Sequence, residues 1–155
     1  MNNYTQIKDN RTDNLNLQKQ LGYAGLIPFI ALTVMLYIVP AEELSKVTLA
    51  FMTYSACILS FMAGTLWGMN TARELSKGAL IVTNLLTISA WITLNLSSQL
   101  IPLSLLAVGF IVSYFTERPY SLPNLTGSLY LQMRMRLTTI VVLCHLLFLF
   151  GIFYR

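Results

Sequence analysis

Charged side chains are scarce in this sequence. They make up 10% of its 155 residues, whereas 55% of the residues are hydrophobic. An average soluble domain carries about a quarter charged residues. So few charges could not cover the core that so many apolar residues would build in water. The composition therefore excludes an ordinary soluble domain and favours a membrane protein.

Ionisable acids and strong bases are also missing from the five long apolar runs of the chain. Each run is comparable to the roughly 20 residues that a helix needs to cross a hydrocarbon core of about 30 Å. Buried carboxylates mark proton relays and ion pathways, so their absence argues against a proton-coupled pump or carrier. The runs are Leu21–Val39, Val47–Met69, Ala79–Leu96, Leu100–Thr116 and Leu137–Tyr154.

Cysteine and enzyme motifs are equally sparse. The two cysteines both lie inside apolar runs, which makes a disulfide framework improbable on spacing alone. The sequence contains no nucleophile motif, phosphate-cradling glycine loop, His-Glu-x-x-His or Cys-x-x-Cys. We therefore predict a protein that is not an enzyme and that carries no cofactor.

The five long apolar runs predict an all-α integral membrane protein with a bundle of five transmembrane helices. Alternating polarity, as in an outer-membrane barrel, is absent. Backbone polar groups in lipid must be satisfied within each helix, so the runs should be helical. Residues 1–20 form a polar cytoplasmic tail, and residues 21–155 form a single membrane domain. The first run ends in a sequence resembling a cleavage site, but it is longer than a secretory signal and should remain as a span.

Basic residues predict the orientation of the bundle. With a cytoplasmic N-terminus, eight of the ten Lys and Arg residues fall on the inner side, and Lys46 and Arg155 fall outside. We therefore predict a multi-pass protein of the bacterial inner membrane whose C-terminus is outside. The net charge of +4 comes from helix ends, so nucleic-acid binding is not expected. The inner residues are Lys8, Arg11, Lys19, Arg73, Lys77, Arg118, Arg134 and Arg136.

Small residues recur every four positions along the second run. This spacing places them on one helix face, where small side chains let two helix backbones approach closely in lipid. We predict a packing face on the central helix of the bundle, against a helix of the same chain or of another copy. The row consists of Ala56, Ser60, Gly64, Gly68 and Ala72.

Three stretches resemble the domain-of-unknown-function 3429 family of small bacterial multi-helix membrane proteins. They are LGYAGLIPFIA from residue 21, YSACILSFMAGTLWG from residue 54 and LYLQMRMRLTTIVV from residue 129. Family members usually have glycine where Ala63 stands, and an aromatic residue such as Tyr130 before the arginine pair. The resemblance implies a membrane location, and it supplies no catalytic residues.

Polar residues gather at the predicted cytoplasmic edge of the spans. Anchoring by the positive-inside rule and by an interfacial tryptophan explains them most simply. The functional alternative is a pocket for an anion or a lipid headgroup, with the arginines as donors. The residues are Trp67, Asn70, Arg73, Asn84, Glu117, Arg134 and Arg136.

The two arginines of this edge should point in different directions. Residues two apart on a helix lie about 200° apart, so Arg134 and Arg136 cannot both face one site. Arg134 shares a face with Tyr130 and Thr138, which carry hydroxyl groups. We therefore predict that Arg134 points inward, with Glu117 or Asn84 as its partner, and that Arg136 reaches the headgroups.

His145 and Cys57 lie at similar predicted depth in the membrane. An ionisable residue in a span is a functional hypothesis by default. Two ligands do not complete a tetrahedral zinc shell, however, so we expect no metal site. A neutral histidine making one interhelical hydrogen bond is the simpler interpretation.

Two functions follow from these patterns. The first is an accessory or scaffold subunit that packs through the small-residue face, against itself or a partner membrane protein. The second is a protein that handles a lipid or small solute through the cytoplasmic-edge residues. A deep cavity lined by Asn70, Asn84 and Arg134 would favour the second, and an exposed small-residue seam would favour the first.

Overall fold

The computed structural model describes residues 16–70, 74–120 and 125–154, and within these ranges the chain forms only helices, turns and short connections. The predicted all-α class is therefore confirmed. A first helix covers residues 16–24 and ends in a turn at Gly25 and Leu26. Five longer helices follow, with short 3-10 turns at Ala41–Glu43 and Arg118–Tyr120. They are α2 (Ile27–Ile38), α3 (Leu44–Met69), α4 (Lys77–Thr93), α5 (Leu100–Glu117) and α6 (Leu125–Tyr154).

The first predicted span is broken in the structure, because the helix over residues 16–24 and α2 are separate elements. Pro28 lies in the first turn of α2, where its missing N–H would have no helical partner anyway. The hydroxyl of Tyr54 on α3 donates to the carbonyl of Gly25, with 3.0 Å between the oxygens. This bond satisfies a carbonyl at the turn and fixes the break against the neighbouring helix.

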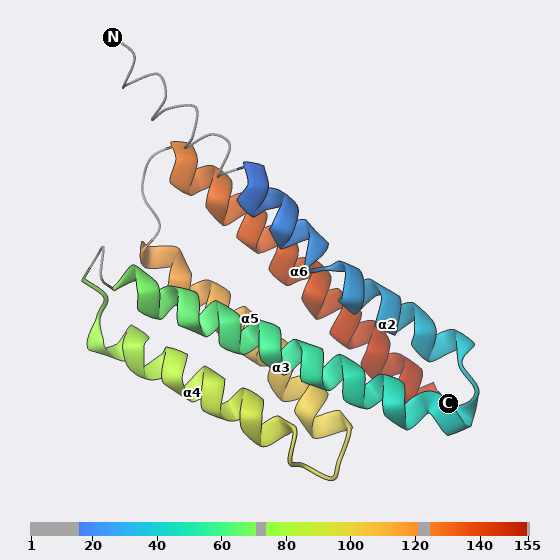
Figure 1. The fold of residues 1–155 in the computed structure, drawn as a ribbon. Helices are drawn as coiled ribbons and strands as arrows, with labels where there is room; N and C mark the ends of the chain where they lie inside the picture. Colours follow the sequence, from blue (N-terminus) through green and yellow to red (C-terminus); the bar gives the residue numbers. More distant parts are fainter. Residues whose placement is uncertain (1–15, 71–73, 121–124, 155) are drawn as a thin grey trace.

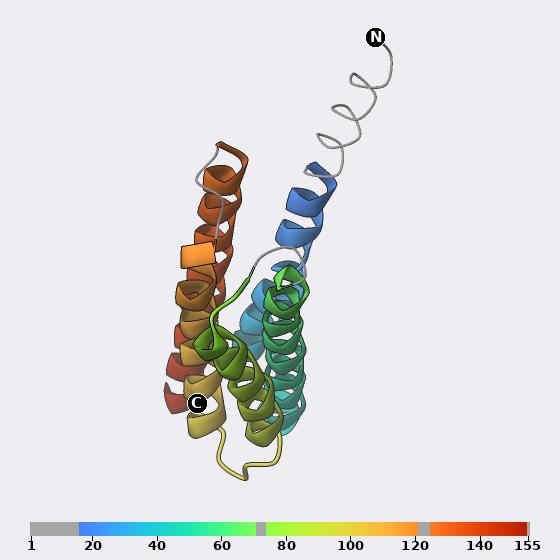
Figure 2. The ribbon, with the colours of Figure 1, turned by 90° about the vertical axis from the view of Figure 1, so that its left-hand side faces the viewer.

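Helices α3 and α5 occupy the middle of the bundle (Figures 1 and 2). Helix α3 packs against α2, α4 and α5, and α5 packs against α3, α4 and α6. Helix α2 closes the arrangement by packing on α6. The prediction that the second long helix is central is therefore confirmed. The described chain begins and ends at opposite ends of the bundle (Figure 1).

Aromatic side chains form the centre of the core. Phe29, Phe51, Phe110 and Phe148 are buried, and Phe29 makes edge contacts with Phe51 and Phe110 at centroid distances of 5.7 and 5.9 Å. Large leucine, isoleucine and phenylalanine side chains are exposed on every helix. A surface this apolar would be unfavourable in water but suits a hydrocarbon environment. Packing and surface together indicate a helical bundle that lies in a membrane.

Helix length agrees with this environment, with one exception. Four helical segments are long and apolar enough to cross a membrane: residues 16–38, 41–69, 100–120 and 127–154. Helix α4 is apolar but has only 17 residues, which corresponds to about 26 Å at 1.5 Å per residue. The structure thus indicates a multi-pass membrane protein, with four segments of full length where the sequence predicted five.

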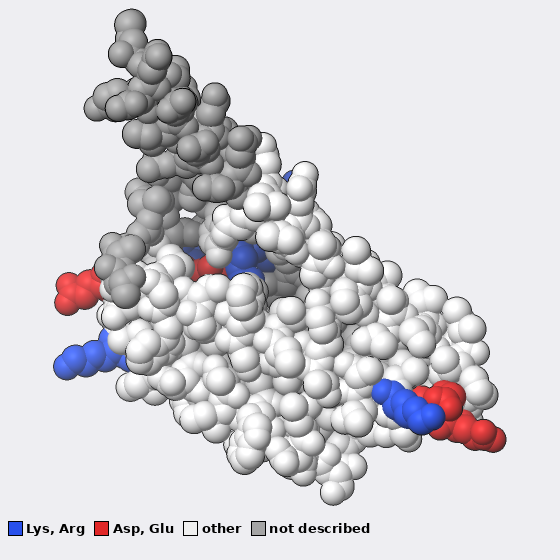
Figure 3. Space-filling model, in the orientation of Figure 1, with Lys and Arg blue, Asp and Glu red and all other residues white. Residues whose placement is uncertain are grey.

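Charged side chains gather toward the two ends of the bundle, with an extended white surface between them in Figure 3. Exposed Lys46 pairs with Glu43 at the start of α3, with 2.9 Å between Nζ and Oε1. Glu74 and Lys77 precede and begin α4 near the other end. This distribution matches headgroup regions on either side of an apolar slab.

The small-residue row does not pack within the chain as a whole. Ala56 is buried, but Gly64 and Gly68 are exposed, and a Cβ atom added at either would meet nothing within 4 Å. Ser60 is half-buried, and Ala72 lies outside the described residues. Of the two alternatives given above, packing against another described helix of this chain does not occur at either glycine, because their face points out of the described bundle.

At two other glycines, side chains of a neighbouring helix lie close against the glycine backbone. A Cβ at Gly109 on α5 would lie 2.6 Å from Cδ2 of Leu59, which is fully buried on α3. A Cβ at Gly151 on α6 would lie 2.5 Å from Cδ2 of Leu36 and 3.0 Å from the hydroxyl of Tyr37. These glycines allow the contacts between α3 and α5 and between α2 and α6.

Candidate functional site: a buried ion pair beside a hollow

An ion pair joins the end of α5 to the first half of α6. Glu117 is the last residue of α5, and its Oε2 lies 2.6 Å from Nε of Arg134. Glu117 is 0% exposed and Arg134 is 4% exposed. The inward orientation predicted for Arg134, with Glu117 as its partner, is confirmed. Buried charges are costly unless they are paired, so each group requires the other.

Tyr130 completes the coordination of the carboxylate. It lies one turn before Arg134 on α6, and its hydroxyl donates to Oε1 of Glu117. Each carboxylate oxygen thus accepts a hydrogen bond from a different side chain of α6. Such bonds to an ionised acceptor are stronger than those between neutral groups. The three residues fix the relative position of α5 and α6 at this level.

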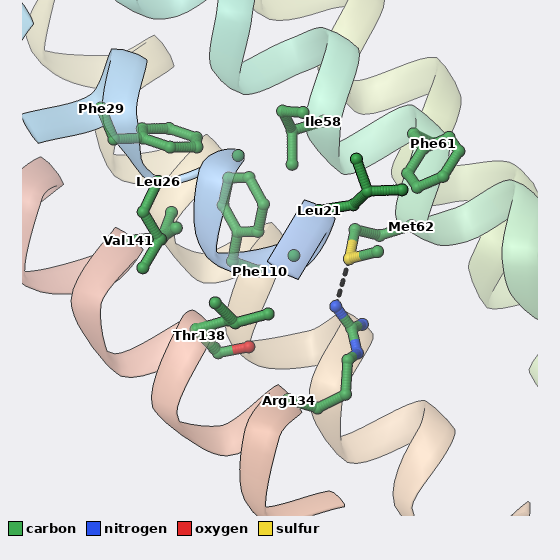
Figure 4. A pocket seen from close by; sticks show the side chains of 13 residues that line it. Leu21, Leu26, Phe29, Ile58, Phe61, Met62, Phe110, Arg134, Thr138 and Val141 are labelled. Carbon is green, nitrogen blue, oxygen red and sulfur yellow. Dashed lines mark hydrogen bonds between the residues drawn. The ribbon is translucent and has the colours of Figure 1, made fainter. Parts of the chain in front are cut away.

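The outer nitrogens of the Arg134 guanidinium point away from the carboxylate. Nη1 contacts Sδ of Met62 on α3, as the dashed line in Figure 4 shows. A thioether is only a weak acceptor, whereas a guanidinium carries five strong donors. Among the described residues, the Arg134 side chain contacts Glu117 through Nε and Met62 through Nη1. Strong donors therefore remain at a place where the protein is hollowed.

A hollow of about 460 Å³ opens beside the guanidinium. It lies between the helix over residues 16–24, α3 and the first half of α6. Figure 3 shows a depression of the surface in which blue and red atoms meet. Among the described residues that line the hollow, Arg134 alone is charged. The lining consists of Leu17, Gln18, Leu21, Gly22, Phe61, Met62, Thr65, Tyr130, Met133, Arg134 and Leu137.

A narrower hollow of about 120 Å³ adjoins the first and reaches toward the aromatic core. The two share Leu21, Gly22, Phe61, Met62, Arg134 and Leu137 in their linings. Figure 4 shows Phe29, Phe110 and Val141 around the narrower hollow, with Arg134 on the opposite side. The combined shape is an apolar channel with one cationic group at its side. This combination fits an amphiphilic molecule better than a water-soluble one.

The rest of the predicted edge cluster does not converge on this site. Arg136 is exposed and lines a shallow depression with Lys19 and Gln132, on another face of α6. Asn70 accepts a hydrogen bond from the backbone N–H of Leu75 at 3.1 Å, which holds the connection between α3 and α4. Exposed Asn84 donates to a carbonyl of its own helix. The two asparagines thus bond to the backbone near their own helices, and Arg136 lies apart from the ion pair.

Trp67 and Arg73 also stand apart from the ion pair. The indole of Trp67 is 49% exposed and lines neither hollow. Interfacial anchoring, the simpler of the two interpretations given above, agrees with this exposure. Arg73 lies outside the described residues. The described residues therefore do not form a pocket from Trp67 and both arginines of α6.

Cys57 and His145 are not brought together either. Cys57 is exposed on α3, whereas His145 is 0% exposed, with its ring 4.8 Å from that of Phe51 between centroids. Nδ1 of His145 lies 2.8 Å from the carbonyl oxygen of Val141 on its own helix, and Nε2 has no recorded partner. The hydrogen bond is therefore within α6 and not between helices. Among the described residues, no group of three His, Cys, Asp or Glu is placed to hold a metal ion.

The sequence placed Tyr130 on the same face as Arg134, four residues before it, but did not predict its hydrogen bond to Glu117. Met62 carried no signal at all, because an apolar residue in a membrane helix has no predicted polar contact. Its role follows from the reach of the Arg134 side chain across to α3.

Comparison with known proteins gives one match. The family model described as "Protein of unknown function (DUF3429)" matches residues 16–150, which is nearly the whole described chain. No curated protein and no solved structure matches the sequence. The matched range contains both hollows, the ion pair and all five long helices except the last turn of α6. The chain therefore belongs to the DUF3429 family of proteins of unknown function.

Proposed function

We propose that this protein binds an amphiphilic molecule of the membrane, a lipid or lipid-like small molecule, in the hollow beside Arg134. One observation carries the proposal: a buried guanidinium directs strong donors at an opening whose other described residues are uncharged and mostly apolar. Ionisable residues inside membrane proteins are expensive and face the bundle interior or a cavity. A purely structural ion pair would not need an open hollow next to its cation.

The setting of this activity is also part of the proposal. The protein acts in the bacterial inner membrane, crosses it five times and has its N-terminus in the cytoplasm. The basic residues on one side of the spans support this orientation. Helix α4 then crosses despite its 17 residues, by local thinning of the bilayer. The hollow lies toward the cytoplasmic leaflet, and the protein binds its ligand without converting it and without a cofactor.

Analysis of co-purified lipid by native mass spectrometry tests the proposal. Thr65→Phe places a large side chain in the hollow, and Thr53→Phe makes the same change at an exposed position of the same helix. We expect the wild-type protein and Thr53→Phe to retain one bound amphiphile after mild extraction, and Thr65→Phe to lose it. Equal retention by the two variants would place any bound lipid elsewhere and reject the hollow as its site.

A second function is supported by a different observation. Gly64 and Gly68 form an open strip on α3, where an added Cβ would meet no described atom of a neighbouring helix within 4 Å, and Phe61 and Trp67 beside them are 64% and 49% exposed. A helix of a second copy or of a partner protein fits such a strip. In a Cys57→Ser background, Gly64→Cys should form a disulfide-linked dimer in membranes if two copies meet there. A wholly monomeric product would exclude the symmetric contact.

A further inference from the structure

The charge of Arg134 is already balanced before any ligand enters. Its guanidinium is always protonated, and Glu117 faces it at 2.6 Å with both oxygens hydrogen-bonded. Tyr130 contributes a neutral hydroxyl, and the other described residues that line the two hollows carry no charge. The described part of the site is therefore electrically neutral, although its accessible group is a cation.

This balance decides which polar group the hollow accepts. A carboxylate or phosphate would bring a second negative charge to a cation that is already neutralised, in a place largely removed from water. A buried charge without its own counter-charge is strongly disfavoured. An uncharged oxygen can accept a charge-assisted hydrogen bond from the Nη atoms and adds no net charge. Its closest competitor in the protein is Sδ of Met62, which is a weak acceptor.

The donor pattern selects the kind of oxygen. The guanidinium of Arg134 offers donors only, and the hydroxyls of Tyr130 and Thr65 are engaged as donors within the protein. Exposed Gln18 is the other polar residue of the described lining. A carbonyl oxygen is a pure acceptor and complements such a wall. Beyond the guanidinium, the narrower hollow of about 120 Å³ runs between Phe29, Phe110 and Val141, and its described lining is apolar apart from Arg134 and Thr138. Its narrowness suits a single alkyl chain.

We propose that the hollow selects an uncharged amphiphile with one alkyl chain, whose carbonyl oxygen, of an ester or a ketone, binds the Nη atoms of Arg134. This inference rests on the proposed function, since it names the ligand class of the same site. It differs from an anion site in one respect that can be measured. Adding a negative charge to the ligand should weaken binding, although the side chain that it meets is an arginine.

Fluorescence quenching by brominated ligands tests this order of affinities. In the full chain in mild detergent, Trp67 and Trp91 are replaced by Phe, and Phe61→Trp puts the sole reporter at the hollow. The probes share one dibrominated alkyl chain and differ at the end: a methyl ester, a carboxylate at alkaline pH, and a plain alkane. We expect the ester to quench saturably at about one tenth of the concentration needed for either of the others.

Three results would overturn the inference. Tighter or equal binding of the carboxylate would assign an anion site and leave the proposed function standing. Equal binding of the alkane would remove Arg134 as a contact. Absence of saturable quenching by every probe would overturn the proposed function together with the inference.

Glu117→Gln provides a second and independent measurement. This change removes the negative charge behind Arg134, so the order of ester and carboxylate should reverse, with the carboxylate at least tenfold tighter. An unchanged order in the folded variant would contradict the charge argument. If the variant does not fold, the order of ester and carboxylate affinities in the wild-type protein is the test of the charge argument. Exposed Glu42→Gln is the matched control and should leave both affinities unchanged.

Discussion

At the scale of single residues, the hydrogen bonds that Tyr130 and Arg134 donate to Glu117 explain the site. The spacing of the two arginines on α6 predicted that only one could face inward, and the hydroxyl-bearing neighbours of Arg134 identified which one. The structure agrees, because the position of a side chain around a helix follows directly from residue number. Residue number does not say which helix lies opposite a side chain. The contact of Arg134 with Met62 was therefore not predictable.

Breaking the ion pair should cost far more than removing it entirely. Glu117→Leu leaves the Arg134 charge buried without a partner, and we expect a loss of about 3–5 kcal/mol in the free energy of unfolding. The double variant Glu117→Leu/Arg134→Leu should recover most of this loss, because no buried charge remains. Denaturant unfolding of the purified variants in detergent measures both. Additive losses in the double variant would show that the two side chains do not interact energetically.

Glycine substitutions should distinguish the close contacts from the open strip. Gly151→Ala pushes on Leu36 and on Tyr37, whose hydroxyl donates to the carbonyl of Leu147 at 2.7 Å. We expect a loss of about 1–3 kcal/mol from this overpacking. Gly64→Ala meets no atom and removes a poor helix former, so it should be neutral or stabilising by up to about 1 kcal/mol. Thermal unfolding in detergent compares the pair, and equal losses would contradict the exposed position of Gly64.

At the scale of elements, the sequence located helices better than it located their faces and breaks. Apolar runs marked all five long helices, because lipid exposure demands apolar side chains along the whole length. Four-residue spacing correctly put Gly64 and Gly68 on one face of α3, but both faces of a membrane helix are apolar. Periodicity therefore gave no sign that this face points outward. The break at Gly25 and Leu26 was missed because hydropathy continues through it, although Gly25 and Pro28 were the local signals.

The hydroxyl of Tyr54 should hold this break in place. Tyr54→Phe removes the donor to the carbonyl of Gly25 and leaves the ring contact with Phe29, at 5.0 Å between centroids. We expect a loss of about 0.5–1.5 kcal/mol and faster amide hydrogen exchange at residues near the turn. The matched change Tyr23→Phe, on the exposed side of the first helix, should alter neither quantity. Unchanged exchange in Tyr54→Phe would mean that the break does not depend on this bond.

At the scale of the whole molecule, the arrangement of helices decides the topology. Charges at both ends and an apolar surface between them define a bundle that lies across a bilayer (Figure 3). Five crossings place residue 16 and Tyr154 on opposite sides, as their positions at opposite ends of the bundle suggest (Figure 1). Four crossings would require α4 to lie outside the hydrocarbon, although it packs along both α3 and α5.

Reporter fusions at the two termini should therefore give opposite signals. We expect the N-terminal fusion to report the cytoplasm and the C-terminal fusion to report the outside, as the distribution of Lys and Arg predicts. A cysteine introduced at Ser98, in the connection between α4 and α5, should be labelled from outside in a Cys57→Ser background. Labelling of Ser98→Cys from the cytoplasm, with both termini on that side, would show that α4 does not cross.

The central claim is that a membrane amphiphile occupies the hollow beside Arg134, and a cryo-electron microscopy structure in lipid nanodiscs tests it most directly. Because the chain is small, a rigid binding partner fused to an end of the bundle distant from the hollow would provide the necessary mass. We predict elongated density that enters between Leu21 and Phe61, ends in the narrower hollow and approaches the Nη atoms of Arg134. A hollow closed by protein side chains, with both Nη atoms bonded to groups of the chain itself, would contradict the account.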